Sequence, residues 1–500
     1  MTQARHGSDV RGLDVPRGVN PPAGRFGRLF PTLDPRPPTG LAMAEEFGLP
    51  GTGLMDGGDT THAQDSPTLD AGFTFLGQFI DHNITFDVTS MLGRQMDPEG
   101  LRNFRPPMLD LDHLYGSGPF ASPYLYDTCS HNTKLVVSPD GVDLGRTSPP
   151  DNVALIGDPR NDENLLLNQL HLAFIKFHNR VVDALAAQEI TDVFGDPFPP
   201  APSTTLPPPN ASIDQLLSVR TYYDDLFAKA QQIVRWHYQW IIVHEYLPLV
   251  AGQDTVDRID RDGLQFYAPD GNPFIPVEFA VAAFRFMHPT IRSEYTINDQ
   301  YTLSLFPLPD PDTGLIPPPP RDPHLRTDLR GGPVAPEFAL DFTHFFAIDD
   351  NRTPQRARRI EAKLNRRLLD LPSITDVPAE IAPQLRSLVV RNLLRSETQE
   401  LPSAQDIARK IGQVPLSDAE LGTTGPIYLW YYILREADLQ HNGGRLGAVG
   451  ALIVSEVLLG LLEADPISYR STYPIWTPTL ANSKGRFGIA ELLRFAGVVK

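Results

Sequence analysis

The sequence predicts a mainly α-helical protein built around one large domain. Apolar residues recur at helical spacing over long stretches, whereas the alternation of apolar and polar residues that is typical of strands is rare. The 50 prolines gather in loops such as 196–209 and 306–323 rather than inside the periodic stretches. The predicted helices cover residues 73–86, 159–187, 212–247, 277–288, 354–370, 379–395, 402–411 and 447–463.

The chain of 500 residues is expected to have two parts. Residues 1–60 are rich in Gly, Pro and Asp and weakly periodic, which predicts an extended N-terminal arm. Residues 61–500 carry the helical patterns and are long enough to bury one large core. We therefore expect a single helical domain with long Pro-rich loops over residues 61–500.

The composition excludes several classes of function. A net charge of −18 argues against nucleic acid or anionic membrane as a partner, because both require basic surfaces. There is no run of 18 apolar residues, and the first 16 residues lack the apolar segment of a secretory signal. These features predict a cytoplasmic protein, with unconventional secretion left open. The single cysteine, Cys129, excludes an internal disulfide framework, and the oligomeric state is not predicted.

The first candidate site is a polar stripe on the predicted helix 73–86. Gln78, Asp81, His82 and Thr85 are spaced i, i+3, i+4 and i+7, so they share one face of an otherwise apolar helix. A solvent-exposed stripe is usually rich in Lys and Glu, which are absent here. The stripe therefore faces a buried polar site, or its His and Asp simply pair with each other inside the core.

The predicted helix 159–187 has a well-marked start. Asp158 is suited to cap it, and Pro159 is favoured at the first helical position. Two histidines further along, His171 and His178, are interpreted as packing residues.

Arg160 stands out because it lies in the first turn of this helix. A cation there is disfavoured by about 0.3–1 kcal/mol against the helix dipole, so we expect it to have a partner elsewhere. The alternative is a local surface pair with Glu163 or Asp162.

The predicted helix 277–288 is short and almost wholly apolar, and it is closed by Pro289. Arg285 and His288 are three residues apart and share a face. A buried imidazole at this position suits a metal ligand, and it equally suits a histidine that caps the helix C-terminus.

Motifs for other chemistries are missing from the sequence: it has no HExxH, no pair of ExxH motifs, no GxSxG, no phosphate-binding GxxxxGK[ST] loop and no Rossmann GxGxxG. What remains is His82, Arg160 and His288, with carboxylates at Asp81 and Glu163. One His to hold a metal, and a second His beside an Arg, is the set that peroxide cleavage at a haem requires.

Four motifs then resemble the animal-type haem peroxidases of the peroxidase–cyclooxygenase superfamily, in its bacterial branch. They are GQFIDHN, RNDE followed by LHLAFIKFHNRV, AFRFMH, and NLLRSETQELPSAQDIARKIG. They occur in the family's order, and the resemblance runs from about Phe73 to about Tyr469. It implies the mainly α fold of that family, with haem b buried between central helices.

The resemblance also implies residue roles on both sides of the haem. His288 would be the axial ligand of the iron, with Asn392 hydrogen-bonded to its other ring nitrogen and Arg285 near the haem edge or a propionate. His82 and Arg160 would line the peroxide side. Further positions are Gln78 near the sixth coordination site and Asp81 and Glu163, which fall where family members form ester links to the haem.

The implied function is a haem peroxidase that reduces hydrogen peroxide via an oxoferryl intermediate, a reaction typical of responses to oxidative stress. It would oxidise a small organic donor or a halide other than chloride, because Asn164 replaces the Met that forms a sulfonium link in some relatives. One alternative is a haem-dependent fatty-acid dioxygenase, but Arg285 stands where that branch has a radical-forming Tyr. The other alternative is a non-catalytic helical binding module.

The resemblance further implies a calcium site, and here the sequence departs from the family. The Asp that follows the distal His and binds calcium is replaced by Asn83, and Pro106 replaces a Thr ligand. Asp110 and Asp112 remain, and oxygen ligands of this kind suit Ca²⁺. The alternative is a loop whose Asp residues cap turns.

Overall fold

The structure is a computed structural model that describes most of the chain. The described residues are 26–58, 64–86, 103, 105–202, 212–269, 272–307, 322–371 and 382–499. Parts of the expected arm and of both Pro-rich loops lie outside these residues.

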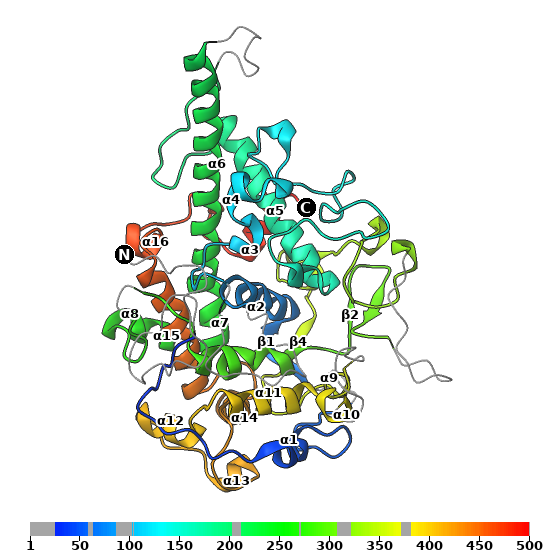
Figure 1. The fold of residues 1–500 in the computed structure, drawn as a ribbon, viewed down its shortest axis with the longest axis vertical. Coiled ribbons are helices and arrows are strands. Elements are labelled where there is room, and N and C mark those ends of the chain that lie inside the picture. Colours follow the sequence, from blue (N-terminus) through cyan, green and yellow to red (C-terminus); the bar gives the residue numbers. More distant parts are fainter. Residues whose placement is uncertain are drawn as a thin grey trace, which may run out of the picture.

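The described residues form a mainly α fold, as predicted (Figure 1). The α-helices are α1 (Gly40–Gly48), α2 (Ala71–Ile84), α3 (Asp112–Tyr115), α4 (Gly118–Ala121), α5 (Leu165–Ala186), α6 (Ile213–Ile241), α7 (Leu247–Ala251), α8 (Gln253–Asp262), α9 (Arg366–Leu369), α10 (Ala382–Leu385), α11 (Leu388–Thr398), α12 (Ala404–Lys410), α13 (Asp418–Leu421), α14 (Leu429–His441), α15 (Ala448–Ala464), α16 (Tyr469–Thr472) and α17 (Ile489–Phe495). Shorter 3-10 turns are η3 (Pro123–Leu125), η4 (Thr128–Ser130), η5 (Pro159–Asp162), η9 (Pro323–Leu325), η10 (Pro336–Phe338) and η11 (Phe342–His344). Two antiparallel ribbons complete the fold: β1 (Asp65–Asp70) with β4 (Arg356–Arg358), and β2 (Glu294–Thr296) with β3 (Thr302–Ser304).

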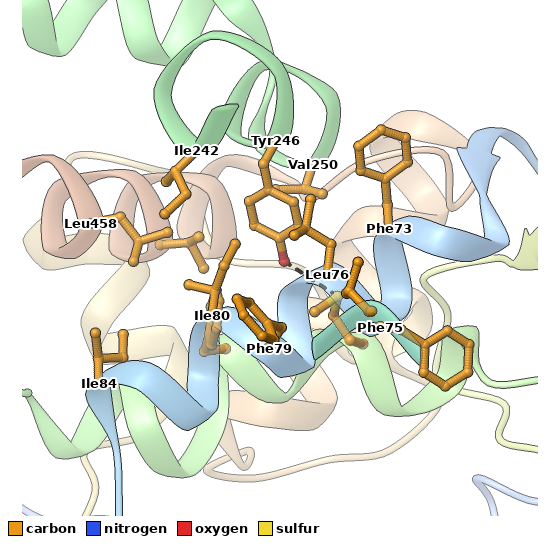
Figure 2. Close-up of a cluster of buried hydrophobic side chains, with 14 of the residues drawn as sticks. Phe73, Phe75, Leu76, Phe79, Ile80, Ile84, Ile242, Tyr246, Val250 and Leu458 are labelled. Carbon is orange, nitrogen blue, oxygen red and sulfur yellow. Dashed lines mark hydrogen bonds between the residues drawn. The ribbon is translucent and has the colours of Figure 1, made fainter. Parts of the chain in front are cut away.

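Helix α2 lies in the middle of the molecule, and most of its residues are buried. It packs against α5, β4 and the irregular helical segment η8 (Ala283–Thr290). Figure 2 shows its apolar side chains meeting those of η6 (Ile242–Tyr246), α7 and α15. Burying each such side chain stabilises the fold by about 1.5–3 kcal/mol, so α2 is anchored by its apolar faces and its polar stripe is left for a site.

Gly77 allows α2 and η8 to approach each other closely. A Cβ at this position would lie 1.5 Å from the terminal carbon of Met287 and 2.3 Å from the hydroxyl oxygen of Tyr246. That hydroxyl donates to the Met287 sulfur at 3.3 Å. The three residues therefore fix how near the two segments lie, and with it the width of the space between them.

The predicted helix at 159–187 is wrong in its first turn. Residues Pro159–Asp162 form the 3-10 turn η5, and α5 begins only at Leu165, with Asn164 accepting from the Leu167 amide at 2.9 Å. The break arises because residues 163–165 pair with the extended segment 329–331. Long-range backbone pairing thus overrides the local helical pattern.

The predicted helix at 354–370 is largely wrong for a similar reason. Residues Arg356–Arg358 form β4 opposite β1, and only Arg366–Leu369 are helical. The Arg356 guanidinium pairs with Asp70 across the ribbon at 2.5 Å.

The predicted helix at 277–288 exists as an irregular one, made of the π-helix η7 (Glu278–Ala282) and the 3-10 segment η8, which includes Pro289.

The described part of the expected arm, residues 26–58, contacts the body of the protein. The buried carboxylate of Glu278 accepts from the backbone amides of Leu29 at 3.0 Å and Phe30 at 3.2 Å. Helix α1 packs on α11. Among the described residues, no helix is long and apolar enough to cross a membrane.

Replacing Gly77 with Ala should destabilise the protein by about 1–3 kcal/mol, because the new methyl group overpacks the contact with Met287. Urea unfolding followed by circular dichroism measures the loss. In the double variant Gly77→Ala/Met287→Ala, removing the Met287 side chain makes room, so the loss should be smaller than the sum of the two single losses. Additive losses would contradict the close approach at Gly77.

Candidate active site

A cavity of about 420 Å³ lies between α2, η5, η7, η8 and α11. This volume falls in the range of roughly 300–1,000 Å³ that is usual for ligand sites. The predicted residues that line it are Gln78, Asp81, His82, Arg160, Glu163, Arg285 and His288. Asn392 lies directly behind His288, so segments more than 300 residues apart in the chain meet at one place.

His82 is held by a chain of hydrogen bonds on the side away from the cavity. Its Nδ1 lies 2.7 Å from the Asn161 carbonyl oxygen, and the Asn161 amide nitrogen lies 2.9 Å from Nδ1 of the buried His171. A carbonyl oxygen only accepts, so this network assigns the proton to His82 Nδ1 and leaves Nε2 with its lone pair. Burial, followed by the charge of Arg160, lowers the pKa of His82 to about 3, so the ring is neutral at ordinary pH.

Arg160 is fixed by a buried carboxylate two residues before it. Its Nη2 lies 2.7 Å from Oδ2 of the fully buried Asp158 and also donates to the backbone carbonyls of His82 and Thr85. Burial alone would raise the pKa of Asp158, but the hydrogen bonds and charge of Arg160 lower it to about 2. The alternative of a local pair with Glu163 or Asp162 is therefore wrong, and the partner is Asp158.

The carboxyl groups of Asp81 and Glu163 both face the cavity. Burial raises the pKa of Glu163 to about 7, even though Arg160 acts in the opposite direction. Burial likewise raises the pKa of Asp81, which accepts from the Thr85 hydroxyl at 2.9 Å. The Gln78 amide donates to Glu163, which directly follows η5, so Gln78 is hydrogen-bonded to the wall of the cavity.

His288 is held from behind by Asn392 and Arg285. The Asn392 amide nitrogen lies 3.0 Å from His288 Nδ1, while its carbonyl oxygen accepts from Arg285 at 2.8 Å. Because the guanidinium only donates, it fixes which way this amide points. His288 Nε2 is then the ring nitrogen that remains for the cavity, and burial lowers the pKa of His288 to about 3.

The same end of the cavity is electropositive. Burial, followed by the charges of Arg395 and Arg391, lowers the pKa of Arg285 to about 9. Arg395 lines the cavity together with Arg285. Guanidinium groups gathered in this way favour an anionic group of a ligand, such as a carboxylate.

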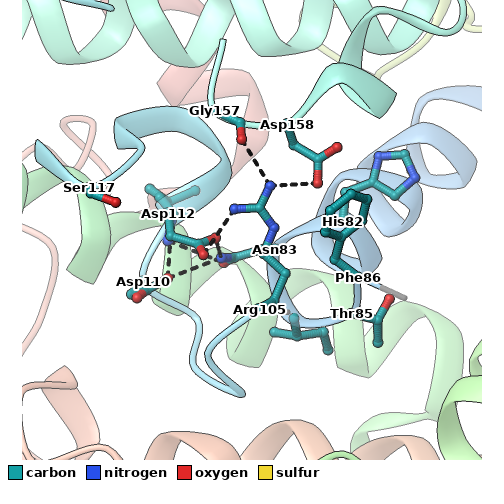
Figure 3. Close-up of polar contacts among 12 residues, drawn as sticks. His82, Asn83, Thr85, Phe86, Arg105, Asp110, Asp112, Ser117, Gly157 and Asp158 are labelled. Atoms are coloured by element: carbon teal, nitrogen blue, oxygen red, sulfur yellow. Dashed lines mark hydrogen bonds and ion pairs between the residues drawn. The ribbon is translucent and has the colours of Figure 1, made fainter. Parts of the chain in front are cut away.

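The residues of the predicted calcium site also come together. The Asn83 amide nitrogen lies 3.1 Å from Asp110 Oδ1 and 3.2 Å from Asp112 Oδ1 (Figure 3). A residue that the sequence did not single out, Arg105, lies 3.0 Å from Asp112 and 2.7 Å from Asp158.

The cavity fits a haem by the chemistry of its lining. Imidazole nitrogens are available at His82 and His288, and the arginine-rich end suits propionate groups. The remaining wall is largely apolar, as a macrocycle requires; its residues are Phe26, Val277, Ala280, Val281, Phe284, Met287 and Ile291.

Sequence reasoning missed Asn161 as the partner of His82. The only signal in the sequence is that Asn161 follows Arg160 directly, and adjacency does not show that the two side chains reach the same neighbouring helix. Asp158 was identified as a cap, which it is for the Arg160 amide at 2.9 Å, but not as the counter-ion of the arginine.

Glu163→Gln should change how stability depends on pH. The folded chain holds the Glu163 proton up to about pH 7, whereas the unfolded chain releases it near the ordinary pKa of 4.5. The native chain should therefore lose stability relative to the variant from pH 4.5 to pH 7, by up to about 3 kcal/mol, and no further above that. Urea unfolding of the haem-free chain across this pH range measures it, with Glu46→Gln on the exposed face of α1 as the control. Parallel curves for the native chain and Glu163→Gln would contradict the buried carboxyl.

Comparison with known proteins shows similarity to peroxidases over part of the sequence. Residues 98–309 match the family model described as animal haem peroxidase. Human thyroid peroxidase is 24% identical over 220 residues, which make up 43% of this chain and 19% of that protein. The peroxidasin homolog pxn-2 of Caenorhabditis elegans is 28% identical over 141 residues, 28% of this chain and 8% of that protein. The matches thus span less than a fifth of the length of these relatives.

Solved structures share the fold over nearly the whole chain. Peroxidase A of Dictyostelium discoideum superposes with a TM-score of 0.55 at 16% identity, covering 94% of this chain and 92% of that one. The fatty acid alpha-dioxygenase of Oryza sativa gives a TM-score of 0.54 at 14% identity, covering 94% and 78%. Residues 98–309 are thus similar in sequence to animal haem peroxidases, and the chain shares its fold with a solved peroxidase and a solved dioxygenase.

Proposed function

We propose that the protein is a haem-dependent peroxidase that reduces hydrogen peroxide and oxidises a small donor. The observation that carries the proposal is the pair of neutral histidines in one cavity. His82 and His288 each have Nδ1 engaged from behind and Nε2 left for the cavity, and Arg160 is held beside His82.

His288 would hold the iron of haem b through Nε2, and Arg285 and Arg395 would face its propionates. Bound there, the haem supplies the redox chemistry of peroxide reduction. Nδ1 of His288 faces the Asn392 amide N–H and accepts from it, so the neutral ring carries its proton on Nε2. Binding the metal through Nε2 therefore requires this proton to be lost or to move to Nδ1. A proton on Nδ1 would require the Asn392 amide to rotate, which breaks its hydrogen bond with Arg285.

His82 would act as general base and then as general acid. Its Nε2 accepts a proton from one oxygen of hydrogen peroxide and returns it to the departing oxygen, which leaves as water. The other oxygen would become the second water by taking two protons from solvent and two electrons from the donor. The positive charge of Arg160 stabilises the negative charge that develops on the departing oxygen.

The finer features follow from the same residues. The carboxyls of Asp81 and Glu163, whose pKa values are both raised by burial, would be the attachment points for ester links to the haem. Gln78 would lie near the sixth coordination position. Asn164 is occupied as the cap of α5, and no Met stands there for a sulfonium link, so we propose an organic donor or a halide other than chloride.

A fatty-acid dioxygenase is the second candidate, since such enzymes are among the structural neighbours. That branch needs a tyrosine beside the haem, and among the described residues no tyrosine lines the cavity. Arg285 occupies the corresponding position and is committed to Asn392. The geometry therefore favours the peroxidase over the dioxygenase, and the neutral histidine pair favours either over a non-catalytic binding module.

His82→Ala should slow the reaction with hydrogen peroxide by about 10²–10⁴ while the haem is retained, because the general acid–base group is lost. His288→Ala should instead lose the haem absorption band. Stopped-flow absorbance of the haem-loaded protein measures both, with His178→Ala, a buried histidine outside the cavity, as the control. A haem band that survives His288→Ala unchanged, or undiminished peroxide reduction in His82→Ala, would overturn the assignment.

Asn161→Asp should raise the pKa of His82, since a carboxylate in place of the amide favours the charged imidazolium. A charged His82 no longer accepts a proton, so the acidic limb of the pH–rate profile should move to higher pH. Asn161→Ala should lower the rate without such a shift. Identical acidic limbs in the native enzyme and Asn161→Asp would show that Asn161 does not position His82.

A further inference from the structure

We propose that the Arg105 guanidinium takes the place of the calcium ion that the family resemblance implies, so that the loop at 105–112 is fastened to α2 without a metal. The proposal goes beyond the peroxidase function and does not depend on it. It rests on what Arg105 contacts, on the direction in which the Asn83 amide points, and on the charges of the surrounding groups.

Arg105 bridges two carboxylates that come from different segments. Its Nη1 lies 3.0 Å from Asp112 Oδ2 and its Nη2 lies 2.7 Å from Asp158 Oδ2, with a further bond to the Gly157 carbonyl at 3.0 Å. Figure 3 shows the guanidinium between the two carboxylates. The side chain is only 10% exposed, so this is an interior cation rather than a surface one.

The Asn83 amide turns its nitrogen, not its oxygen, toward the carboxylates, and a nitrogen that donates N–H bonds cannot bind a metal ion. Its nitrogen donates to Asp110 and Asp112, while its oxygen accepts from the Leu111 amide at 3.2 Å. A calcium ion between these groups would need oxygen atoms facing it, and it takes six to eight oxygen ligands. Turning the amide to supply its oxygen would break all three hydrogen bonds at once.

Each carboxylate of this group has a guanidinium acting on it. The three carboxylates are Asp110, Asp112 and Asp158, and the three guanidiniums that act on them are Arg105, Arg160 and Arg235. Burial tends to lower the pKa of Arg105, but Asp112 and Asp158 outweigh it and raise the pKa, so the cation keeps its charge.

The first experiment uses the haem-loaded full chain. Elemental analysis after purification should find calcium well below one equivalent. The thermal unfolding midpoint should be the same in excess calcium and in excess of the chelator EGTA. One equivalent of calcium, or a midpoint that falls in the chelator, would overturn the proposal whatever the variants do.

The second experiment converts the site. Arg105→Ala should lower the midpoint by several degrees, because it leaves Asp112 and Asp158 buried without their partner. In Arg105→Ala/Asn83→Asp, excess calcium should raise the midpoint by several degrees, since the missing cation is now supplied from solution. The matched control is Asn83→Asp alone, where Arg105 still fills the position and calcium should have no effect.

Each outcome is decisive for the position of the cation. A double variant that folds and ignores calcium, or a calcium-responsive Asn83→Asp, would overturn the replacement of calcium by Arg105. If Arg105→Ala does not fold, Arg105→Gln keeps the bulk and removes the charge. Combined with Asn83→Asp, this variant is put to the same calcium titration.

Discussion

The site depends on the ion pairs that the fully buried carboxylate of Asp158 makes with two arginines. It holds Arg160 on one side and Arg105 on the other, and it accepts the Arg160 backbone amide as well. A buried charge that loses its partner destabilises a protein by several kcal/mol, so neither arginine is free to leave. Through these two partners a single side chain connects η5, the loop at 105–112 and the C-terminal end of α2.

A second constraint is the burial of the histidines at and behind the cavity wall. His82, His171 and His113 are all buried, and burial keeps each of them uncharged by lowering its pKa. An amide oxygen that accepts from one nitrogen of a neutral imidazole leaves the lone pair on the other nitrogen, as at His82. This is how hydrogen bonds made on the far side of a ring determine what the ring does on the near side. At His288 the assignment is reversed, because Arg285 turns the amide nitrogen of Asn392 toward Nδ1, so Nδ1 accepts and the proton lies on Nε2.

The sequence predicted the members of the site better than their connections. The stripe of Gln78, Asp81 and His82 follows from helical spacing alone, and Arg160 was identified because a cation opposes the dipole at a helix start. Its partner was expected elsewhere in the fold, with a local pair to Glu163 or Asp162 as the alternative, whereas its carboxylate partner is Asp158, two residues before it. The segment is a 3-10 turn rather than a regular helix, because residues 163–165 pair with 329–331, and that pairing is invisible to local periodicity. The strand at Arg356–Arg358 was missed for the same reason, since its pairing partner lies almost 300 residues earlier.

The neutral side chain at Asn83 and the charged side chain at Arg105 depend on each other, because together they set the net charge of the site. A site with a calcium ion and an aspartate at position 83 would carry two positive charges and one negative charge from these two groups. Arg105 carries one positive charge and Asn83 carries none, so both arrangements contribute a net charge of about +1. The amide also donates hydrogen bonds to Asp110 and Asp112, which a carboxylate at position 83 would repel. Replacing the metal ion with an arginine, while keeping an aspartate at position 83, would leave one negative charge without a partner. The change from Asp to Asn at position 83 and the buried Arg105 guanidinium therefore belong together. This arrangement connects the loop to Arg160 through Asp158 by bonds within the chain, and its strength does not vary with the concentration of a free ion.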